Sequence, residues 1–345
     1  MLLSEGNFAT SRAYIDSNWV DGGISVEDYK LTSYSESSGD QGMAIPGFVD
    51  LQVNGHGGVD LLSAESADEI RVVSRSLYKN EVAGYLPTVI TSSLEKAVKT
   101  IKLIEQVRKD PKSNEALILG VHLEGPFISA EKAGVHPKEF IAPPNLDHLK
   151  ALLAAGLIKQ VTLAPEIAGA IDLIKFLVDQ NIIVSLGHSN ATKAQAIAGF
   201  EAGAKTVTHL FNAMPKPPEQ GLSDAAIERA DVVIQIIVDG VHVSDQLLSQ
   251  TLPKIMDRFI ITNDAVAAAG LGDGNFTFGD INVVAKDGQA RSVEGKLAGG
   301  IANISDSMRR LAALGISDEI AIASATTRPC DLIGVNYKSV INHFN

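Results

Sequence analysis

Eight apolar, β-branched segments recur along the chain, and helix-like segments lie between most of them. The apolar segments are residues 44–53, 83–91, 117–125, 160–166, 182–189, 206–214, 232–240 and 258–265. The helix-like segments include 66–80, 93–109, 167–180, 191–203 and 244–257. Near-continuous apolar strands that alternate with helices are typical of a parallel sheet covered on both faces. Eight such units predict a (β/α)8 barrel in preference to an open sheet.

The two flanks of this pattern are less regular. Short strands are predicted around 13–20 and 24–33, followed by a polar loop, SYSESSGDQG. A glycine-rich stretch at 270–300 follows the eighth apolar segment. It predicts an inserted hairpin, and two further helices are expected at 301–314 and 317–327.

Composition and charge narrow the classes of function. The chain has 345 residues, which suits one large domain with appendages, because an α/β barrel takes about 250 residues. Its 29 Lys and Arg residues against 41 Asp and Glu give a formal net charge of −12, which argues against nucleic acid or an anionic membrane as a partner. The single cysteine, Cys330, excludes a disulfide framework. With no signal-like segment and no apolar run of about 18 residues, we expect a cytoplasmic protein that does not span a membrane.

Four residues with metal or acid–base chemistry lie within the apolar segments. Glu124, His188 and Asp264 each lie one residue before the end of the third, fifth and eighth segments, and His209 lies in the sixth. In a (β/α)8 barrel the carboxyl ends of the strands meet at one face, where active sites are built. One carboxylate and two imidazoles suit Zn²⁺ or a similar divalent ion and leave a position open for water, and a second carboxylate can serve as the base. Each residue alone could instead be a polar cap on the core; together they favour a metal-dependent hydrolase.

Other polar groups are predicted at the same face. His136 lies in the loop after Glu124, and His242 follows the seventh segment, where either could donate a hydrogen bond to a substrate oxygen. Asn212 and Ala213 follow His209 and could present backbone N–H groups. Lys216 lies in a proline-stiffened loop, where a solvated surface charge is the first interpretation and contact with a substrate anion the alternative.

Several long motifs carry a family resemblance. They are PGFVDLQVNGHGGVD, HLEGPF, TLAPE, GHSNAT, THLFNAMP and DGVHV. In this order they resemble the N-acetylglucosamine-6-phosphate deacetylases of the amidohydrolase superfamily, from about Pro46 to about Gly334. The resemblance implies a metal-dependent enzyme that hydrolyses a linear amide and removes acetate from N-acetyl-D-glucosamine 6-phosphate.

The resemblance also implies a domain organisation. A (β/α)8 TIM barrel of the metal-dependent hydrolase type is expected at 45–330. A small, reduced β-sandwich domain formed by the chain ends is expected to take residues 1–44, with 331–345 as its short C-terminal remnant. Enzymes of this family lead us to expect a homodimer.

Carried over by position, the motifs assign catalytic roles. Glu124, His188 and His209 resemble the metal ligands of the family, and Asp264 resembles its catalytic acid/base. His136 resembles the residue beside the substrate carbonyl and hydroxyls, which gives it both a catalytic and a substrate-binding role. Zn²⁺ is the expected metal, with Fe²⁺, Mn²⁺ or Co²⁺ as alternatives.

The remaining motif positions resemble a substrate site. His242, Asn212 and Ala213 resemble parts of the sugar-phosphate site. Gln52 and Asn54 stand where many amidohydrolases carry His-x-His for a second metal. Amides are poor ligands beside imidazole, so the resemblance implies a single ion, with both amides at the substrate site.

Three departures from the family pattern leave alternatives open. The loop at 216–224 is short and has no arginine, so Lys216 is the nearest cation for a phosphate. Asn263 is an extra residue in TNDA, and we expect a bulge that still lets Asp264 face the site. The chain also ends soon after CDLIGV. The alternatives are therefore the same hydrolysis of N-acetylgalactosamine 6-phosphate or another N-acetyl sugar, or an amino-sugar-binding protein that has lost catalysis.

Overall fold

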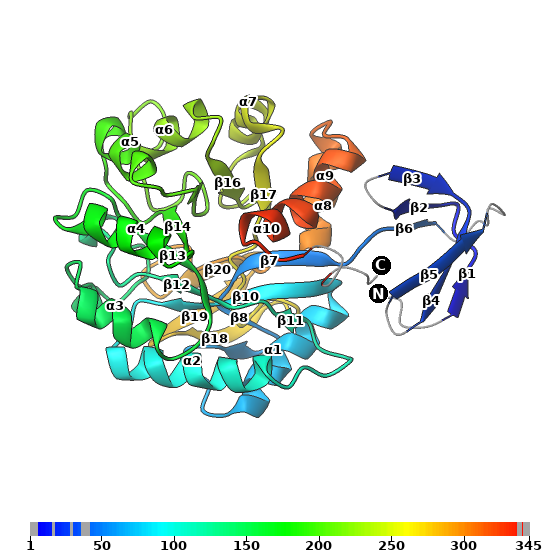
Figure 1. Ribbon diagram of the computed structural model, residues 1–345, viewed down its shortest axis with the longest axis horizontal. Coiled ribbons are helices and arrows are strands. Elements are labelled where there is room, and N and C mark those ends of the chain that lie inside the picture. The colour runs from blue at the N-terminus through cyan, green and yellow to red at the C-terminus, as the bar shows by residue number, and fades with distance from the viewer. Residues whose placement is uncertain (1–5, 16–17, 28–29, 36–41, 337–339, 341–345) are drawn as a thin grey trace.

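Eight parallel strands form a barrel at the centre of the computed structural model, which describes residues 6–15, 18–27, 30–35, 42–336 and 340 (Figure 1). The barrel strands are β7 (Phe48–Val53), β10 (Val82–Ile90), β12 (Val121–Glu124), β13 (Ile158–Leu163), β14 (Ile183–Leu186), β15 (Thr206–Val207), β16 (Val233–Ile236) and β17 (Phe259–Ile261). Each pairs in parallel with the next, and a two-residue strand, β11 (Leu117–Ile118), also pairs with β10. The predicted barrel is confirmed.

The seam of the barrel, where the first strand β7 meets the last strand β17, is closed by few backbone contacts. Strands β7 and β17 meet beyond the end of β17, through a single parallel bridge between Val53 and Ala265. The Asn54 N–H donates to the Ala265 carbonyl at 2.7 Å, and the Ala265 N–H donates to the Gln52 carbonyl at 3.3 Å. The segment that follows β17 therefore closes the barrel.

Helices cover the outside of the barrel (Figure 1). They are α1 (Ala67–Lys79), α2 (Leu94–Arg108), α3 (Leu146–Leu153), α4 (Ala170–Asp179), α5 (Lys193–Glu201), α6 (Leu222–Glu228), α7 (Asp245–Ile255), α8 (Ile304–Ala313), α9 (Asp318–Ala325) and α10 (Thr327–Leu332), with 3-10 turns at Ala130–Lys132 and Lys138–Phe140. Seven of them lie close to the predicted ranges; α3, α6 and α10 were not among the predictions. Among the described helices, none is long and apolar enough to cross a membrane.

The barrel interior contains a chain of polar side chains as well as the usual branched residues. The His122 Nε2 lies 2.7 Å from the Thr162 hydroxyl, which lies 2.7 Å from that of Thr208. The Ser185 hydroxyl lies 2.5 Å from the Thr208 hydroxyl. These buried groups satisfy one another, which removes most of the cost of burying them.

The first strands of the chain form two three-stranded sheets beside the barrel (Figure 1). They are β1 (Gly6–Phe8), β2 (Arg12–Ile15), β3 (Asn18–Asp21), β4 (Gly23–Glu27), β5 (Lys30–Ser35) and β6 (Met43–Ala44). Each of the two strands predicted here is therefore an antiparallel pair, β2–β3 and β4–β5. Most of the predicted polar loop, residues 36–41, lies outside the described residues.

Two polar contacts join these sheets to α9. The Arg12 guanidinium lies 3.1 Å from the Asp318 carboxylate, and the Trp19 indole N–H donates to Glu319 at 3.1 Å. The described part of 331–345 lies elsewhere: Ile333 and Val340 pack with apolar residues of the barrel strands. The assignment of 331–345 to the small β domain thus stays a prediction.

The glycine-rich stretch forms a three-stranded antiparallel sheet, one strand more than the predicted hairpin. Its strands are β18 (Gly274–Phe278), β19 (Ile281–Lys286) and β20 (Gln289–Ser292). The buried Asp60, in the short pair β8 (Gly55–His56) and β9 (Val59–Asp60), accepts a hydrogen bond from the Gly279 N–H at 3.1 Å. This contact fixes the β18–β19 turn over the barrel end.

Candidate active site

A pocket of about 150 Å³ opens at the carboxyl ends of the barrel strands. Eight of the residues predicted for the site line it: Glu124, His136, His188, His209, Asn212, Ala213, His242 and Asp264. Phe278 and Leu297, from the inserted sheet and the segment after it, complete one wall. Among the predicted residues, the structure therefore brings together side chains that are up to 140 positions apart in the sequence, from Glu124 to Asp264.

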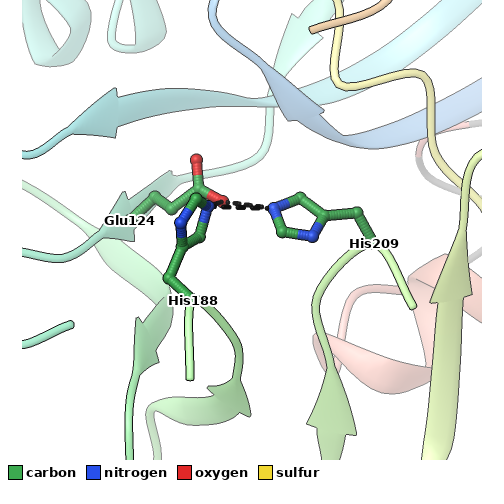
Figure 2. Close-up of side chains that lie close together, drawn as sticks. All are labelled: Glu124, His188 and His209. Carbon is green, nitrogen blue, oxygen red and sulfur yellow. Dashed lines mark hydrogen bonds and ion pairs between the residues drawn. The ribbon is translucent and has the colours of Figure 1, made fainter. Parts of the chain in front are cut away.

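Glu124, His188 and His209 form a compact buried cluster (Figure 2). The Glu124 Oε1 lies 3.0 Å from His209 Nε2 and 3.3 Å from His188 Nε2, and the two Nε2 atoms are 3.2 Å apart. Tetrahedral ligands at ~2.0–2.1 Å from a zinc ion lie roughly 3.3 Å from one another. The three donor atoms thus have the spacing and the chemistry of a three-ligand metal site.

Contacts around the cluster orient its donor atoms. The Lys132 carbonyl lies 2.9 Å from His188 Nδ1, which places the proton on that nitrogen and leaves the Nε2 lone pair free. The Gln52 side-chain amide donates to Glu124 Oε1 at 2.8 Å. Both histidines have positive φ, 46° for His188 and 33° for His209, so the chain turns sharply where each strand ends.

The electrostatics of the cluster favour a cation. Burial disfavours the charged form of Glu124, yet its contacts with His136, His188 and His209 hold the pKa of this carboxyl well below its usual range. Burial opposes a charge on His209 as well, but the neighbouring Glu124 raises the pKa of its imidazole. The cluster thus stabilises positive charge at the point where the three donor atoms meet.

Asp264 lines the same pocket from the segment between the end of β17 and the seam bridge at Ala265. It has a φ of 51°, and its Oδ1 accepts a hydrogen bond from the Asn54 amide at 2.7 Å. Strand β17 ends at Ile261, so the extra residue Asn263 lies in an irregular segment rather than in the strand ladder. The side chain of Asp264 is therefore not turned away by a one-residue register shift. Burial, followed by the nearby Glu124 charge, raises the pKa of the Asp264 carboxyl.

Two further histidines line the pocket, and each has a fixed orientation. His136 Nδ1 lies 2.9 Å from the Thr91 hydroxyl, and its Nε2 lies 3.6 Å from Glu124 Oε2. Burial, followed by the neighbouring His188, lowers the pKa of His136 to about 4. His242 Nδ1 lies 2.7 Å from the Asp239 carboxylate.

The other predicted substrate residues differ in position. Asn212 and Ala213 line the pocket in the turn after β15. Gln52 and Asn54 are buried next to it, where they bind Glu124 and Asp264. Lys216 is exposed and is not among the residues that line the pocket.

Known proteins show where this arrangement belongs. The sequence profile of the amidohydrolase family matches residues 43–343. The chain belongs to the amidohydrolase family. Its relatives include N-acetylglucosamine-6-phosphate deacetylase of Bos taurus, 35% identical over 339 residues, which cover 92% of this chain and 82% of the relative. N-acetylgalactosamine-6-phosphate deacetylase of Escherichia coli O157:H7 is 31% identical over 302 residues, which cover 86% of this amidohydrolase and 80% of the relative.

Solved structures agree with these relatives. The N-acetylglucosamine-6-phosphate deacetylase of Pasteurella multocida matches with a TM-score of 0.86 at 31% identity, over 95% of this chain and 90% of that chain. An alanine variant of the Mycobacterium smegmatis deacetylase, solved with N-acetyl-D-glucosamine-6-phosphate, matches with a TM-score of 0.87 at 27% identity, over 96% and 91% of the two chains. The resemblance seen in the motifs of this amidohydrolase is confirmed.

Four supporting residues of this amidohydrolase were not predicted. Asp50 accepts a hydrogen bond from the Asn263 N–H, next to Asp264, while Thr91 and Asp239 contact the rings of His136 and His242. Glu166, in TLAPE, accepts hydrogen bonds from the Ser189 hydroxyl at 2.8 Å and the Asn190 N–H at 2.6 Å, next to His188. All but Thr91 lie in quoted motifs, but in the sequence nothing distinguishes them from ordinary polar residues near strand ends.

Proposed function

We propose that this amidohydrolase deacetylates N-acetyl-D-glucosamine 6-phosphate to D-glucosamine 6-phosphate and acetate, in amino-sugar catabolism. The observation that carries the proposal is the Glu124–His188–His209 cluster with Asp264 facing the same pocket. Deacetylases of this sugar phosphate are among its relatives at about a third identity over most of the chain.

We propose Glu124, His188 and His209 as the ligands of one divalent ion. Their mixed carboxylate and imidazole donors suit Zn²⁺, with Fe²⁺, Mn²⁺ or Co²⁺ as alternatives. When bound, such an ion supplies Lewis acidity that polarises an amide carbonyl and makes a water more acidic. Gln52 and the Lys132 carbonyl would hold two of the ligands in place.

The other pocket residues would carry the proton transfers and hold the substrate. Asp264 would take a proton from the attacking water as the carbon–oxygen bond forms. It would return that proton to the amine nitrogen as the carbon–nitrogen bond breaks. His136 would donate a hydrogen bond from Nε2 to the acetyl oxygen, where negative charge develops.

The sugar phosphate would lie against Asn212, Ala213 and His242. Lys216 would serve as a point charge near the phosphate if its loop moves towards the pocket. A second candidate substrate is N-acetylgalactosamine 6-phosphate, because a deacetylase of that sugar is 31% identical to this chain. Residues 216–224 contain no arginine that could bind the phosphate. The unphosphorylated N-acetyl sugars are therefore a third group of substrates to compare.

The test measures acetate release and metal content of Asp264→Asn. We expect kcat to fall by ~10²–10⁴ while one metal ion per chain remains bound, because the variant keeps the ligands and loses the acid/base. Asp287→Asn is the matched control, since Asp287 is also an aspartate with positive φ, 49°, but is exposed in the β19–β20 turn.

Two outcomes would contradict the proposal. Near-full activity of Asp264→Asn with metal bound would exclude the acid/base role. Wild-type protein that binds the sugar phosphates but releases no acetate with any of the four divalent ions would instead favour a binding protein. A higher kcat/KM for the galacto sugar or for the free sugars would change the substrate and leave the chemistry intact.

Three further properties stay predictions. We propose a homodimer in the cytoplasm, on the family resemblance and on composition. We also propose the division of the chain into a small β domain and a barrel near residue 44.

A further inference from the structure

Asp50 is a fully buried carboxylate in the middle of β7, with no exposed surface. Its Oδ1 accepts hydrogen bonds from the Thr262 hydroxyl at 2.8 Å and the Gln52 N–H at 3.1 Å. Its Oδ2 accepts one from the Asn263 N–H at 3.3 Å. Both oxygens are therefore used, and two of the three donors come from the two residues before Asp264.

These contacts fall on the irregular segment of the barrel wall between β17 and the seam bridge. Strand β17 ends at Ile261, and the next β-bridge to β7 is the one from Ala265 to Val53. Thr262, Asn263 and Asp264 span this gap. The extra residue of TNDA lies here, and its N–H bonds to Asp50 instead of a strand partner.

Keeping a carboxylate at this point is costly. The three donors are neutral, and burial raises the pKa of Asp50 to about 7 despite their hydrogen bonds. An asparagine would avoid the buried charge, but its amide has one acceptor oxygen and would turn an N–H₂ donor towards the Asn263 or Thr262 donor. The carboxylate is the side chain of this size that can accept from both.

We infer that Asp50 is a positioning residue that holds the Thr262–Asn263 segment so that Asp264 faces the pocket. The inference rests on the proposed acid/base role of Asp264. Asp50, in β7, and Asn54, directly after β7, both act on Asp264: Asp50 fixes the backbone that leads to Asp264, and Asn54 binds its carboxylate.

A double-mutant cycle tests this role. In Asp50→Asn we expect kcat to fall roughly tenfold, because about one hydrogen bond is lost and a donor faces a donor. KM and metal content should stay within about twofold, since the three ligands lie on other strands. In the Asp264→Asn background, Asp50→Asn should lower kcat no further, because it acts through the residue already removed.

Two controls separate positioning from loss of stability. Glu115→Gln removes another buried carboxylate, one that pairs with Arg71 at 2.6 Å and Arg75 at 3.2 Å, away from the pocket. It should lower stability and leave kcat unchanged. Thr262→Val removes one donor and keeps the shape of the side chain, so it should lower kcat severalfold even if Asp50→Asn folds poorly.

The outcomes are distinct. An unchanged kcat in both Asp50→Asn and Thr262→Val, or an equal tenfold loss from Asp50→Asn in the Asp264→Asn background, would overturn the positioning role. Full activity of Asp264→Asn would instead overturn the proposed function on which the inference rests.

Discussion

Three histidines of the pocket are each held by a contact on the ring nitrogen Nδ1. The partners are the Lys132 carbonyl for His188, the Thr91 hydroxyl for His136 and the Asp239 carboxylate for His242. The nitrogen that faces away from the partner, Nε2, is thereby left for the pocket. Because the contact on one ring nitrogen decides the state of the other, these partners set which imidazoles donate and which bind a cation.

Thr91 is the partner that contacts His136. Its hydroxyl has one proton to donate and lies 2.9 Å from His136 Nδ1 and 3.3 Å from the Glu124 carbonyl. When it donates to His136 Nδ1, the Nε2–H of His136 points into the pocket as the proposed carbonyl donor. In Thr91→Val we expect kcat to fall roughly five- to tenfold, the effect of about one hydrogen bond, with metal content unchanged. Steady-state kinetics with metal analysis checks this; loss of the metal ion instead would mean that Thr91 supports the ligands.

The residues with metal chemistry could be predicted because each follows an apolar strand, and the ends of parallel strands meet at one face. Asp50, Thr91 and Asp239 could not be predicted, since their function depends on which strand lies beside them. Lys216 shows the reverse case: the sequence left both a solvated surface charge and a substrate contact open, and the structure places it exposed, outside the pocket lining.

At the scale of elements, one catalytic motif proves to have two parts. GHSNAT supplies His188 and then starts α5 with a capping box: the Gln195 N–H donates to the Thr192 hydroxyl at 3.3 Å, and the Thr192 N–H donates to Gln195 at 2.9 Å. The last residue of the motif therefore stabilises a helix.

Thr192→Ala should accordingly lower the free energy of unfolding by about 1 kcal/mol, the usual contribution of an N-cap. Urea denaturation followed by circular dichroism measures this, and kcat at saturating metal should stay unchanged. Thr192→Ser, which keeps the hydroxyl, is the matched control and should restore most of the stability. A loss of metal affinity with stability unchanged would instead give Thr192 a role at the site.

The longer helices could be predicted at nearly their observed bounds, because their apolar stripes and caps are strong signals. The short helices α3, α6 and α10 were not predicted, and each of the two predicted N-terminal strands is a pair of shorter antiparallel strands. Both differences have one cause: the ends of a short helix or strand are decided by contacts with residues far away in the sequence, which the local pattern does not show. The contact of Arg12, in β2, with Asp318, in α9, is an example: the two residues are more than 300 positions apart in the sequence.

For the molecule as a whole, burial of neutral histidines makes stability depend on pH. His56 is outside the pocket lining, with its Nδ1 2.8 Å from the Ser76 hydroxyl, and burial lowers its pKa to about 4. The unfolded chain takes up this proton below about pH 6.5, whereas the folded protein does not. The free energy of unfolding therefore falls as pH drops from about 6.5 to about 4, by at most ~1.4 kcal/mol per pH unit for this group.

His56→Gln removes this contribution, so the stability difference between wild type and variant should shrink as the pH is lowered through that window. Denaturant unfolding at several pH values between 7 and 4 checks the prediction. Parallel stability curves for the two proteins would mean that His56 is protonated equally in the folded and unfolded states.

The position of Asp264 beside the seam of the barrel would link substrate binding to the stability of the enzyme. The wall is closed there by one bridge, at Ala265, and the preceding residue is the proposed acid/base. A molecule bound against Asp264 would stabilise the folded state, and this stabilisation would grow as the concentration of the molecule rises above its Kd. The enzyme would then be most resistant to heat and proteases while it is saturated, and most vulnerable when its supply of amino sugar runs out.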